Sequence, residues 1–296
     1  LYATSEANSS MPKGAKVAGF RTDQLRCVPL RDDLSMEPTD LADLVVEDRR
    51  AGFVPCFVLA TSGTTSSMAF DPLREIGEIC QEQGLWMHVD AAMAGSAAIC
   101  PELRGFQDGV ELADSYAFNP HKWLLTNFDC DCFYVRDRTV LTDALSATPE
   151  YLRNAATTSG SVVDYRDWQI PLGRRFRALK LWFVLRSYGA EGLRRHIRNH
   201  VALAGRLRAR VDADERFGLC APPALNLLCF AHVAGDAVTE QLLHDLNATS
   251  RVLLSHTVIG GRLAIRCSIG GAWTATRHVD ELWSLIDELA PPVSAA

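Results

Sequence analysis

Two side chains in the sequence place a reactive group among apolar neighbours. Asp90 ends the run LWMHVD and is followed by small residues, and Lys122 lies inside the run NPHKWLL. A carboxylate or an amine in such a place is costly unless a partner meets it, so each could serve a ligand. Each also has an ordinary interpretation, because Asp90 could cap the next helix and the Lys122 side chain could reach solvent.

A third polar stretch, ATSGTTSSMAFDPL at residues 60–73, adds hydroxyl and backbone donors. An amine can form a Schiff base with the aldehyde of pyridoxal 5'-phosphate, a carboxylate can keep its ring nitrogen protonated, and such donors can hold its oxygens. The small residues after Asp90 would leave room for a flat ring. The three stretches together therefore indicate a pyridoxal phosphate site, although neither Asp90 nor Lys122 does so alone.

The elements expected around these residues would bring them together. Apolar runs at residues 55–62, 85–92, 115–120 and 132–137 read as strands, and residues 73–84 have the spacing of a helix that ends at a glycine. Strands that alternate with helices predict βαβ units and a mostly parallel sheet with helices on both faces. In such sheets ligands bind at the carboxyl ends of the strands, where all three polar stretches lie.

The rest of the chain predicts a loop, a connecting helix and a second unit. The loop spans 147–165 and the helix 171–189; helices at 191–213, 237–249 and 277–289 then alternate with strands at 225–233 and 262–270. We expect a large cofactor-binding domain over residues 1–179 and a small C-terminal α+β domain over residues 180–296. The chain starts at Leu1 in what reads as a strand, so we expect a fragment that lacks the N-terminal part of the large domain.

Composition argues against several classes of function. The formal charge of −6 does not favour a nucleic acid or an anionic membrane as partner. No apolar run is long enough to span a membrane, and the start of the chain lacks the features of a signal peptide. Nine scattered cysteines are typical of reduced core thiols. We expect a cytoplasmic protein whose partner is a small polar metabolite.

Two further patterns could bind a metal ion. Cys130 and Cys132 form a CxC pair on an expected strand, and His196 and His200 are spaced to share one face of a helix. The cysteines lack a second pair at zinc spacing, and no glutamate stands between the histidines as in zinc proteases. We therefore expect no metal site, and we expect the two histidines to lie on a solvated face of their helix.

Four motifs carry a resemblance to a known family. HVDAAMAGSAAICPE, FNPHKWLLTNFDC, DYRDWQIPLGRRFRALKLWFV and the pattern ATSGTT....FDPL closely resemble the pyridoxal-phosphate-dependent aromatic L-amino-acid decarboxylases, the group II decarboxylases of fold type I. The resemblance runs from about residue 2 to residue 290. It implies the fold-type I transferase-like architecture, a homodimer with the active site at the subunit interface, and decarboxylation of an aromatic L-amino acid to its amine.

The resemblance also implies roles for individual residues. Lys122 would hold the cofactor, Asp90 would pair with its ring nitrogen, and Ala92 would lie against its ring. Tyr151, in the loop motif PEYL, would return a proton to the substrate carbon after carbon dioxide leaves, although it could be an ordinary exposed aromatic. The other implied cofactor contacts are Thr65, Asn119, His121 and the position of Asn8.

Asn8 departs from the family pattern. Decarboxylases of the family usually have a histidine here that stacks on the cofactor ring, and asparagine can neither stack as well nor act as an acid or base near pH 7. Some insect aldehyde synthases of the family carry asparagine at the matching place and release aldehyde, ammonia and peroxide. The sequence thus leaves open an aromatic amino-acid decarboxylase, an aromatic acetaldehyde synthase and a non-catalytic homologue. Tyr151 favours the first, since its loss marks the plant route to the aldehyde.

Overall fold

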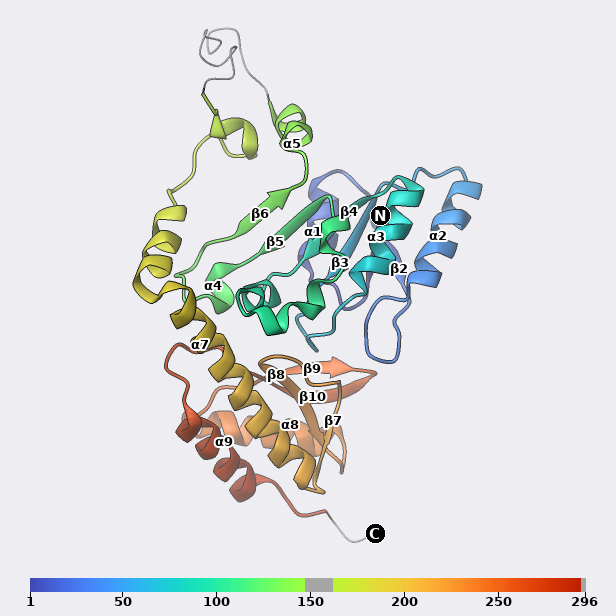
Figure 1. Ribbon diagram of the computed structural model, residues 1–296. Coiled ribbons are helices and arrows are strands. Elements are labelled where there is room, and N and C mark those ends of the chain that lie inside the picture. The colour runs from blue at the N-terminus through green and yellow to red at the C-terminus, as the bar shows by residue number, and fades with distance from the viewer. Residues whose placement is uncertain (147–161, 294–296) are drawn as a thin grey trace.

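The computed structural model describes residues 1–146 and 162–293, which form two lobes connected by a long helix (Figure 1). The larger lobe holds a six-stranded sheet in the order β2-β1-β3-β4-β5-β6. Its strands are parallel except for β6, which runs antiparallel to β5. Their bounds are β1 Tyr2–Thr4, β2 Arg26–Val28, β3 Phe57–Thr61, β4 Trp86–Asp90, β5 Ser115–Phe118 and β6 Cys132–Val135.

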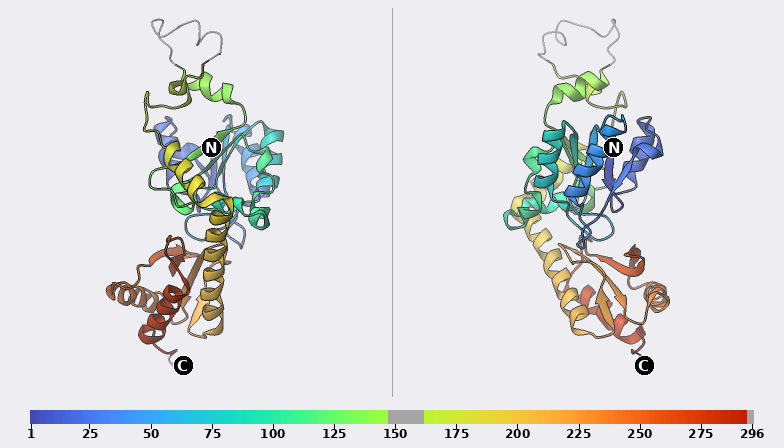
Figure 2. Two further views of the ribbon diagram at one scale, coloured as in Figure 1. Left: turned by 60° about the vertical axis from the view of Figure 1, so that its left-hand side comes forward. Right: turned by 90° about the vertical axis from the view of Figure 1, so that its right-hand side faces the viewer.

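Helices cover both faces of this sheet, as Figure 2 shows. Residues of β3 alternate between the two faces: Val58 and Ala60 join one core cluster with α2 and α3, and Leu59 joins another with α1. The helices are α1 Ser10–Val17, α2 Pro38–Arg50 and α3 Leu73–Gln83. The predicted mostly parallel sheet with two covered faces is therefore confirmed.

Helix α3 illustrates how the sequence sets these elements. Leu73, Ile76 and Cys80 are spaced to share one face, and all three are buried against the sheet. The helix ends at Gly84, which adopts a left-handed conformation with φ 63°. The predicted span of 73–84 agrees with the structure to within one residue.

The large lobe and the segment that leads from it to α7 also contain short helical elements. They are the helices α4 Pro120–Trp123 and α5 Arg138–Leu145 and the 3₁₀ turns Thr22–Gln24, Ala94–Ile99, Pro101–Gln107, Val110–Leu112 and Tyr165–Trp168. Of the predicted loop at 147–165, residues 147–161 lie outside the described residues.

The smaller lobe is an α+β unit, as predicted. Its antiparallel sheet has the order β7-β8-β10-β9, and a core of leucine, isoleucine and aromatic side chains lies between this sheet and its helices. The bounds are α7 Ala178–Ala213, β7 Phe217–Leu219, β8 Leu227–His232, α8 Asp236–Ala248, β9 Ser255–Ile259, β10 Arg262–Ser268 and α9 Thr276–Leu289.

The connecting helix differs from the prediction at its start. It begins at Ala178 rather than at Pro171, and Gly173, which the predicted span placed inside the helix, disfavours a helix interior. Gly189, with φ 63° and ψ 173°, interrupts the helical backbone where the prediction placed a break between two helices. Strands β7 and β9 were not predicted. A domain boundary at residue 179 stays a prediction.

All nine cysteines are free thiols, and Cys27 and Cys56 are exposed rather than part of a core.

No helix within residues 1–146 or 162–293 is both long and apolar enough to cross a bilayer. Within the same residues, no cluster of three or more histidine, cysteine or acidic side chains is arranged to hold a metal ion.

Candidate active site

A cavity of about 290 Å³ opens where the carboxyl ends of β3 and β4 meet strand β10 of the smaller lobe. Five predicted site residues line it: Asn8, Thr65, Asp90, Ala92 and Lys122. The remaining lining residues are Thr61, Gly63, Thr64, Met93, Arg266 and Ser268. The sheet thus gathers polar residues that are far apart in the sequence at one edge.

Asp90 is the last residue of β4 and lies in register with Thr61 of β3 and Ala117 of β5. Its Oδ1 accepts a hydrogen bond of 2.9 Å from the backbone N–H of Ala92. Among the described residues, no lysine or arginine forms an ion pair with this half-buried carboxylate. The residue before the next helical turn is Met93, so Asp90 is not a helix cap. The carboxylate is left with acceptor capacity for a ligand.

Lys122 lies on α4, a helix of a single turn that begins with Pro120. The Asn119 backbone N–H donates to the Ala92 carbonyl over 2.8 Å, which holds α4 beside the end of β4. The Lys122 side chain is exposed and lines the cavity. Its amine makes no hydrogen bond or ion pair with any of the residues that the structure describes, so it is available to a ligand.

The loop after β3 forms a second wall of the cavity. Gly63 has φ +95°, and a Cβ at this position would lie 2.6 Å from Ala94 Cβ, so only glycine fits. The Thr64 and Ser67 hydroxyls are hydrogen-bonded at 2.8 Å, and Thr64 Oγ1 accepts the Ala69 N–H at 3.0 Å. These bonds leave the backbone of Gly63 and Thr65 in a defined position at the cavity.

Asp71 fixes the base of this loop. Its carboxylate accepts backbone N–H groups from Thr61 at 2.6 Å and Met36 at 2.7 Å. Burial without a cation raises the pKa of Asp71 to about 6. Asp71 therefore joins the end of β3 to the turn that precedes α2.

Asn8 uses both ends of its side-chain amide. Its Nδ2 donates to the Thr65 hydroxyl at 3.1 Å, and its Oδ1 accepts the Ser10 N–H at 2.9 Å where α1 begins. Asn8 therefore links the start of α1 to the loop after β3. No imidazole occupies this position.

Two predicted site residues do not line the cavity, and a third lies outside the described residues. The Asn119 side chain donates to Asp131 Oδ1 at 2.6 Å. The His121 Nδ1 lies 2.7 Å from the Cys130 carbonyl oxygen and 3.0 Å from its backbone nitrogen. Tyr151 lies outside the described residues. Cofactor contacts by Asn119 and His121 and proton transfer by Tyr151 stay predictions.

Arg266 and Ser268 are lining residues that the sequence did not reveal, because they come from the smaller lobe. Arg266 Nε donates to the Thr65 carbonyl at 2.8 Å, and burial lowers the pKa of its guanidinium. Its two terminal nitrogens remain for an anionic group. The only signal in the sequence was an arginine within the apolar strand LAIRCS.

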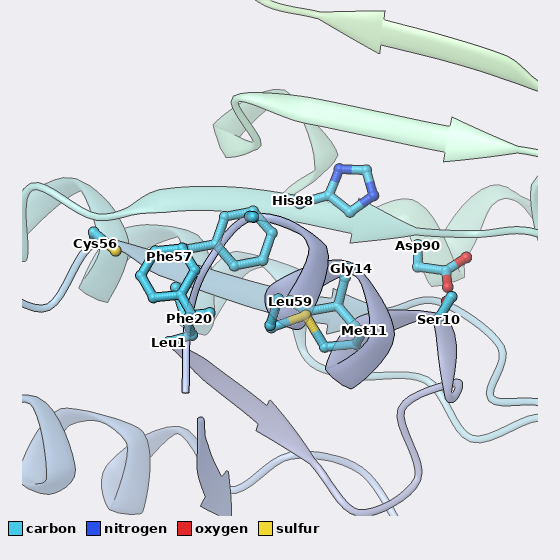
Figure 3. Close-up of a pocket in the computed structure, with 12 residues that line it drawn as sticks. Leu1, Ser10, Met11, Gly14, Phe20, Cys56, Phe57, Leu59, His88 and Asp90 are labelled. Atoms are coloured by element: carbon cyan, nitrogen blue, oxygen red, sulfur yellow. The ribbon is translucent and has the colours of Figure 1, made fainter. Parts of the chain in front are cut away.

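A second cavity, of about 490 Å³, lies on the α1 side of the sheet and also reaches Asp90 (Figure 3). Met11, Phe20, Phe57 and Leu59 give it a largely apolar wall. An apolar wall on one side of Asp90 strengthens the electrostatic interactions that its carboxylate makes on the other. We assign this second cavity no ligand.

Comparison with known proteins identifies the relatives of this chain. A sequence profile described as the pyridoxal-dependent decarboxylase conserved domain matches residues 1–233. The chain is 44% identical over 299 residues to the phenylacetaldehyde synthase of Arabidopsis thaliana, covering 98% of this chain and 61% of that protein. It is 45% identical over 295 residues to the aromatic-L-amino-acid decarboxylase of Bos taurus, covering 100% of this chain and 60% of that protein.

A solved structure gives the same result for the fold. The crystal structure of Oryza sativa TDC with PLP and tryptamine matches with a TM-score of 0.95 and 41% identity, covering 98% of this chain and 62% of that one. This similarity confirms the predicted fold-type I class. The chain spans about 60% of the length of the curated relatives it matches.

Proposed function

The chain belongs to the pyridoxal-dependent decarboxylase family, and on that premise we propose that the whole protein decarboxylates an aromatic L-amino acid to the corresponding amine. The observation that carries the proposal is the juxtaposition of Asp90 and Lys122 in one cavity. There a carboxylate and an amine that have no ionic partner within residues 1–146 and 162–293 line the same space. These are the two groups that the chemistry requires of the protein.

The residues of the cavity fit pyridoxal 5'-phosphate. Lys122 supplies the amine that bonds to the aldehyde carbon, and Asp90 supplies the anion that holds a proton on the ring nitrogen. Ala92 is small enough to lie beside a flat ring, and Thr65 and Arg266 supply donors for polar or anionic groups. When bound, the cofactor withdraws electrons from the substrate Cα and so makes loss of its carboxylate feasible.

The chain's own residues then have distinct tasks. The unpaired Asp90 carboxylate keeps the ring proton in place because no described cation competes for it. Lys122 would hold the cofactor through its side-chain amine, and its Nζ, when not bonded to the cofactor, could take up or return a proton. Tyr151 is the proposed proton donor to the substrate carbon.

The relatives support an aromatic substrate. One is named an aromatic-L-amino-acid decarboxylase, and the matching crystal structure contains tryptamine, an aromatic amine. Which aromatic side chain this protein accepts is part of the test below.

An aromatic acetaldehyde synthase is the second candidate function. It is favoured by Asn8, which places an amide bonded to Thr65 where decarboxylases of the family usually carry an imidazole. A phenylacetaldehyde synthase is also among the similar proteins. Both candidates begin with loss of carbon dioxide and differ in whether oxygen then reacts.

We further propose that the protein is a cytoplasmic homodimer. Leu179, Trp182 and Phe183 on α7 are 44%, 53% and 58% exposed, and a face of that kind is typical of a protein–protein interface. Nine free thiols fit a reducing compartment. Sedimentation equilibrium of the whole protein tests the dimer.

Product analysis tests the function. The whole protein, loaded with pyridoxal phosphate, is incubated in air with L-tryptophan, L-tyrosine or L-phenylalanine, and carbon dioxide, amine, aldehyde and peroxide are measured. Decarboxylation gives amine and carbon dioxide in equal amounts without peroxide. Aldehyde with peroxide indicates the second candidate, and bound cofactor without carbon dioxide indicates a non-catalytic homologue.

A further inference from the structure

His200 is a fully buried histidine of α7, the long helix that connects the two lobes (Figure 1). It is held by one hydrogen bond to each lobe. The Trp123 indole Nε1 of α4 donates to His200 Nδ1 at 3.0 Å, and His200 Nε2 lies 3.1 Å from the Gly271 carbonyl oxygen after β10. The active-site chemistry above makes no use of this residue.

These two contacts define the state of the ring. An indole N–H can only donate and a carbonyl can only accept, so His200 is neutral with its proton on Nε2. The Trp123 and His200 rings are also nearly parallel, with an interplanar angle of 4°. Burial, with the neighbouring His196 as a second cause, lowers the pKa of His200 to about 4, so the neutral form persists at physiological pH.

Both partners of His200 are close in sequence to residues that line the active-site cavity. Trp123 follows Lys122 directly, and Gly271 lies a short distance after Ser268 and Arg266 on β10. Helix α4 has a single turn and little intrinsic stability of its own. Besides the Asn119 bond to the Ala92 carbonyl, its position therefore depends on what holds Trp123, which is 1% exposed in a cluster with Ala97, Cys100 and Ile197.

We propose that His200 is a positioning residue that holds Lys122 at a fixed place relative to the cavity wall formed by Arg266 and Ser268. It does so by joining Trp123 and Gly271 through one imidazole. The catalytic consequence rests on the proposed function, whereas the structural link does not. Removal of the imidazole should increase local opening in both walls of the cavity, although they belong to different lobes.

Hydrogen–deuterium exchange in the cofactor-free whole protein tests the link without reference to activity. His200→Leu should raise amide exchange roughly fivefold or more in two segments, residues 120–126 and 269–274. His200→Gln offers an acceptor and a donor at similar separation, so exchange in both segments should return to within about twofold of the original protein.

His232 provides a matched control. It is also fully buried, its Nδ1 accepts the Ala234 N–H at 3.1 Å, and its Nε2 lies 3.0 Å from the Pro291 carbonyl oxygen. His232→Leu should lower the melting temperature but leave exchange in 120–126 and 269–274 within about twofold of the original. If His200→Leu raises amide exchange in these two segments no more than His232→Leu does, the inference is wrong.

Two further measurements test the role of His200. If His200→Leu does not fold, Trp123→Phe keeps an aromatic ring but removes the indole N–H together with the pyrrole part of the ring, and exchange in 120–126 should still rise; unchanged exchange contradicts the inference. In the loaded enzyme, His200→Leu should lower kcat about tenfold or more at saturating cofactor, with rescue by His200→Gln. An original protein that binds no cofactor would overturn the proposed function, while the exchange results would still decide the link.

Discussion

Asn8 donates a hydrogen bond of 3.1 Å from its side-chain amide to the hydroxyl of Thr65, and both residues line the same cavity. The same amide accepts the Ser10 N–H, so its orientation is fixed by two partners. Asn8 is also the position at which this chain departs from the usual pattern of the family's decarboxylases. The residue that we propose to influence the choice between amine and aldehyde is thus a structural link as well.

Asn8→Ala should therefore destabilise the protein and weaken cofactor binding together. We expect the free energy of unfolding to fall by about 1 kcal/mol, since the start of α1 loses an acceptor and Thr65 loses a donor. Urea unfolding and a cofactor titration followed by absorbance measure the two effects. Ser9→Ala is the control, because the adjacent Ser9 makes no side-chain capping bond. If Ser9→Ala had the same effects as Asn8→Ala, the Asn8 hydrogen bonds would contribute neither to stability nor to cofactor binding.

Asp90→Asn keeps the size of the side chain and removes its charge. We expect kcat to fall by roughly 100-fold or more, because the ring nitrogen of the cofactor loses its anionic partner. The absorbance spectrum of the bound cofactor should change as well. Asp23→Asn, on an exposed carboxylate paired with Arg21, should leave both unchanged. An Asp90→Asn enzyme with the original kcat would exclude the assigned role.

Arg266→Met should raise the cofactor dissociation constant about tenfold. The substitution removes both the bond to the Thr65 carbonyl and the second cation of the cavity wall. Arg266→Lys should recover only part of the affinity, since lysine lacks the planar set of donors. Arg262 lies on the same strand at an exposed position, so Arg262→Met serves as the control. Affinity that is equal in both methionine variants would argue against a role for Arg266.

Asp71 should make stability depend on pH in a direction opposite to most acidic groups. Its folded-state pKa of about 6 lies above the value near 4 of an unfolded chain. The folded state therefore binds the extra proton between these values, and its stability falls as pH rises from about 4 to about 6. The loss amounts to about 3 kcal/mol and is constant above that range.

Urea unfolding at several pH values measures this contribution. Subtraction of the Asp71→Asn curve from the original curve should isolate the slope between pH 4 and 6. Asp143→Asn, at an exposed position of α5, should retain the original slope. If the Asp71→Asn protein showed the same dependence of unfolding free energy on pH, the effect would come from other groups.

The fold of the large lobe could be predicted because its signals are local. The continuous apolar run that forms β3 and the glycine stop after α3 are both visible in the sequence. The start of α7 was predicted too early because the prediction followed the apolar spacing and gave too little weight to Gly173. Strand β9 has mostly exposed residues, so it lacks the apolar run by which strands were recognised.

The site could be predicted only in part, for a different physical reason. Asp90, Lys122 and Thr65 follow strands of one sheet, and parallel strands bring their carboxyl ends together. Arg266 reaches the cavity from the other lobe, and no local pattern reports such a contact. The His200 link was hidden in the same way, because the histidine spacing suggested a metal or a solvated helix face and not a buried bond to Trp123.

Reductive trapping tests the central claim, that Lys122 holds the cofactor, most directly. Borohydride treatment of the whole protein loaded with pyridoxal phosphate reduces the imine to a stable amine, and peptide mass spectrometry then locates the modified lysine. Other lysines of this chain are Lys13, Lys16 and Lys180. We predict stoichiometric modification of Lys122 and none of the other three. Modification at another lysine, with Lys122 unmodified and cofactor bound, would contradict the account.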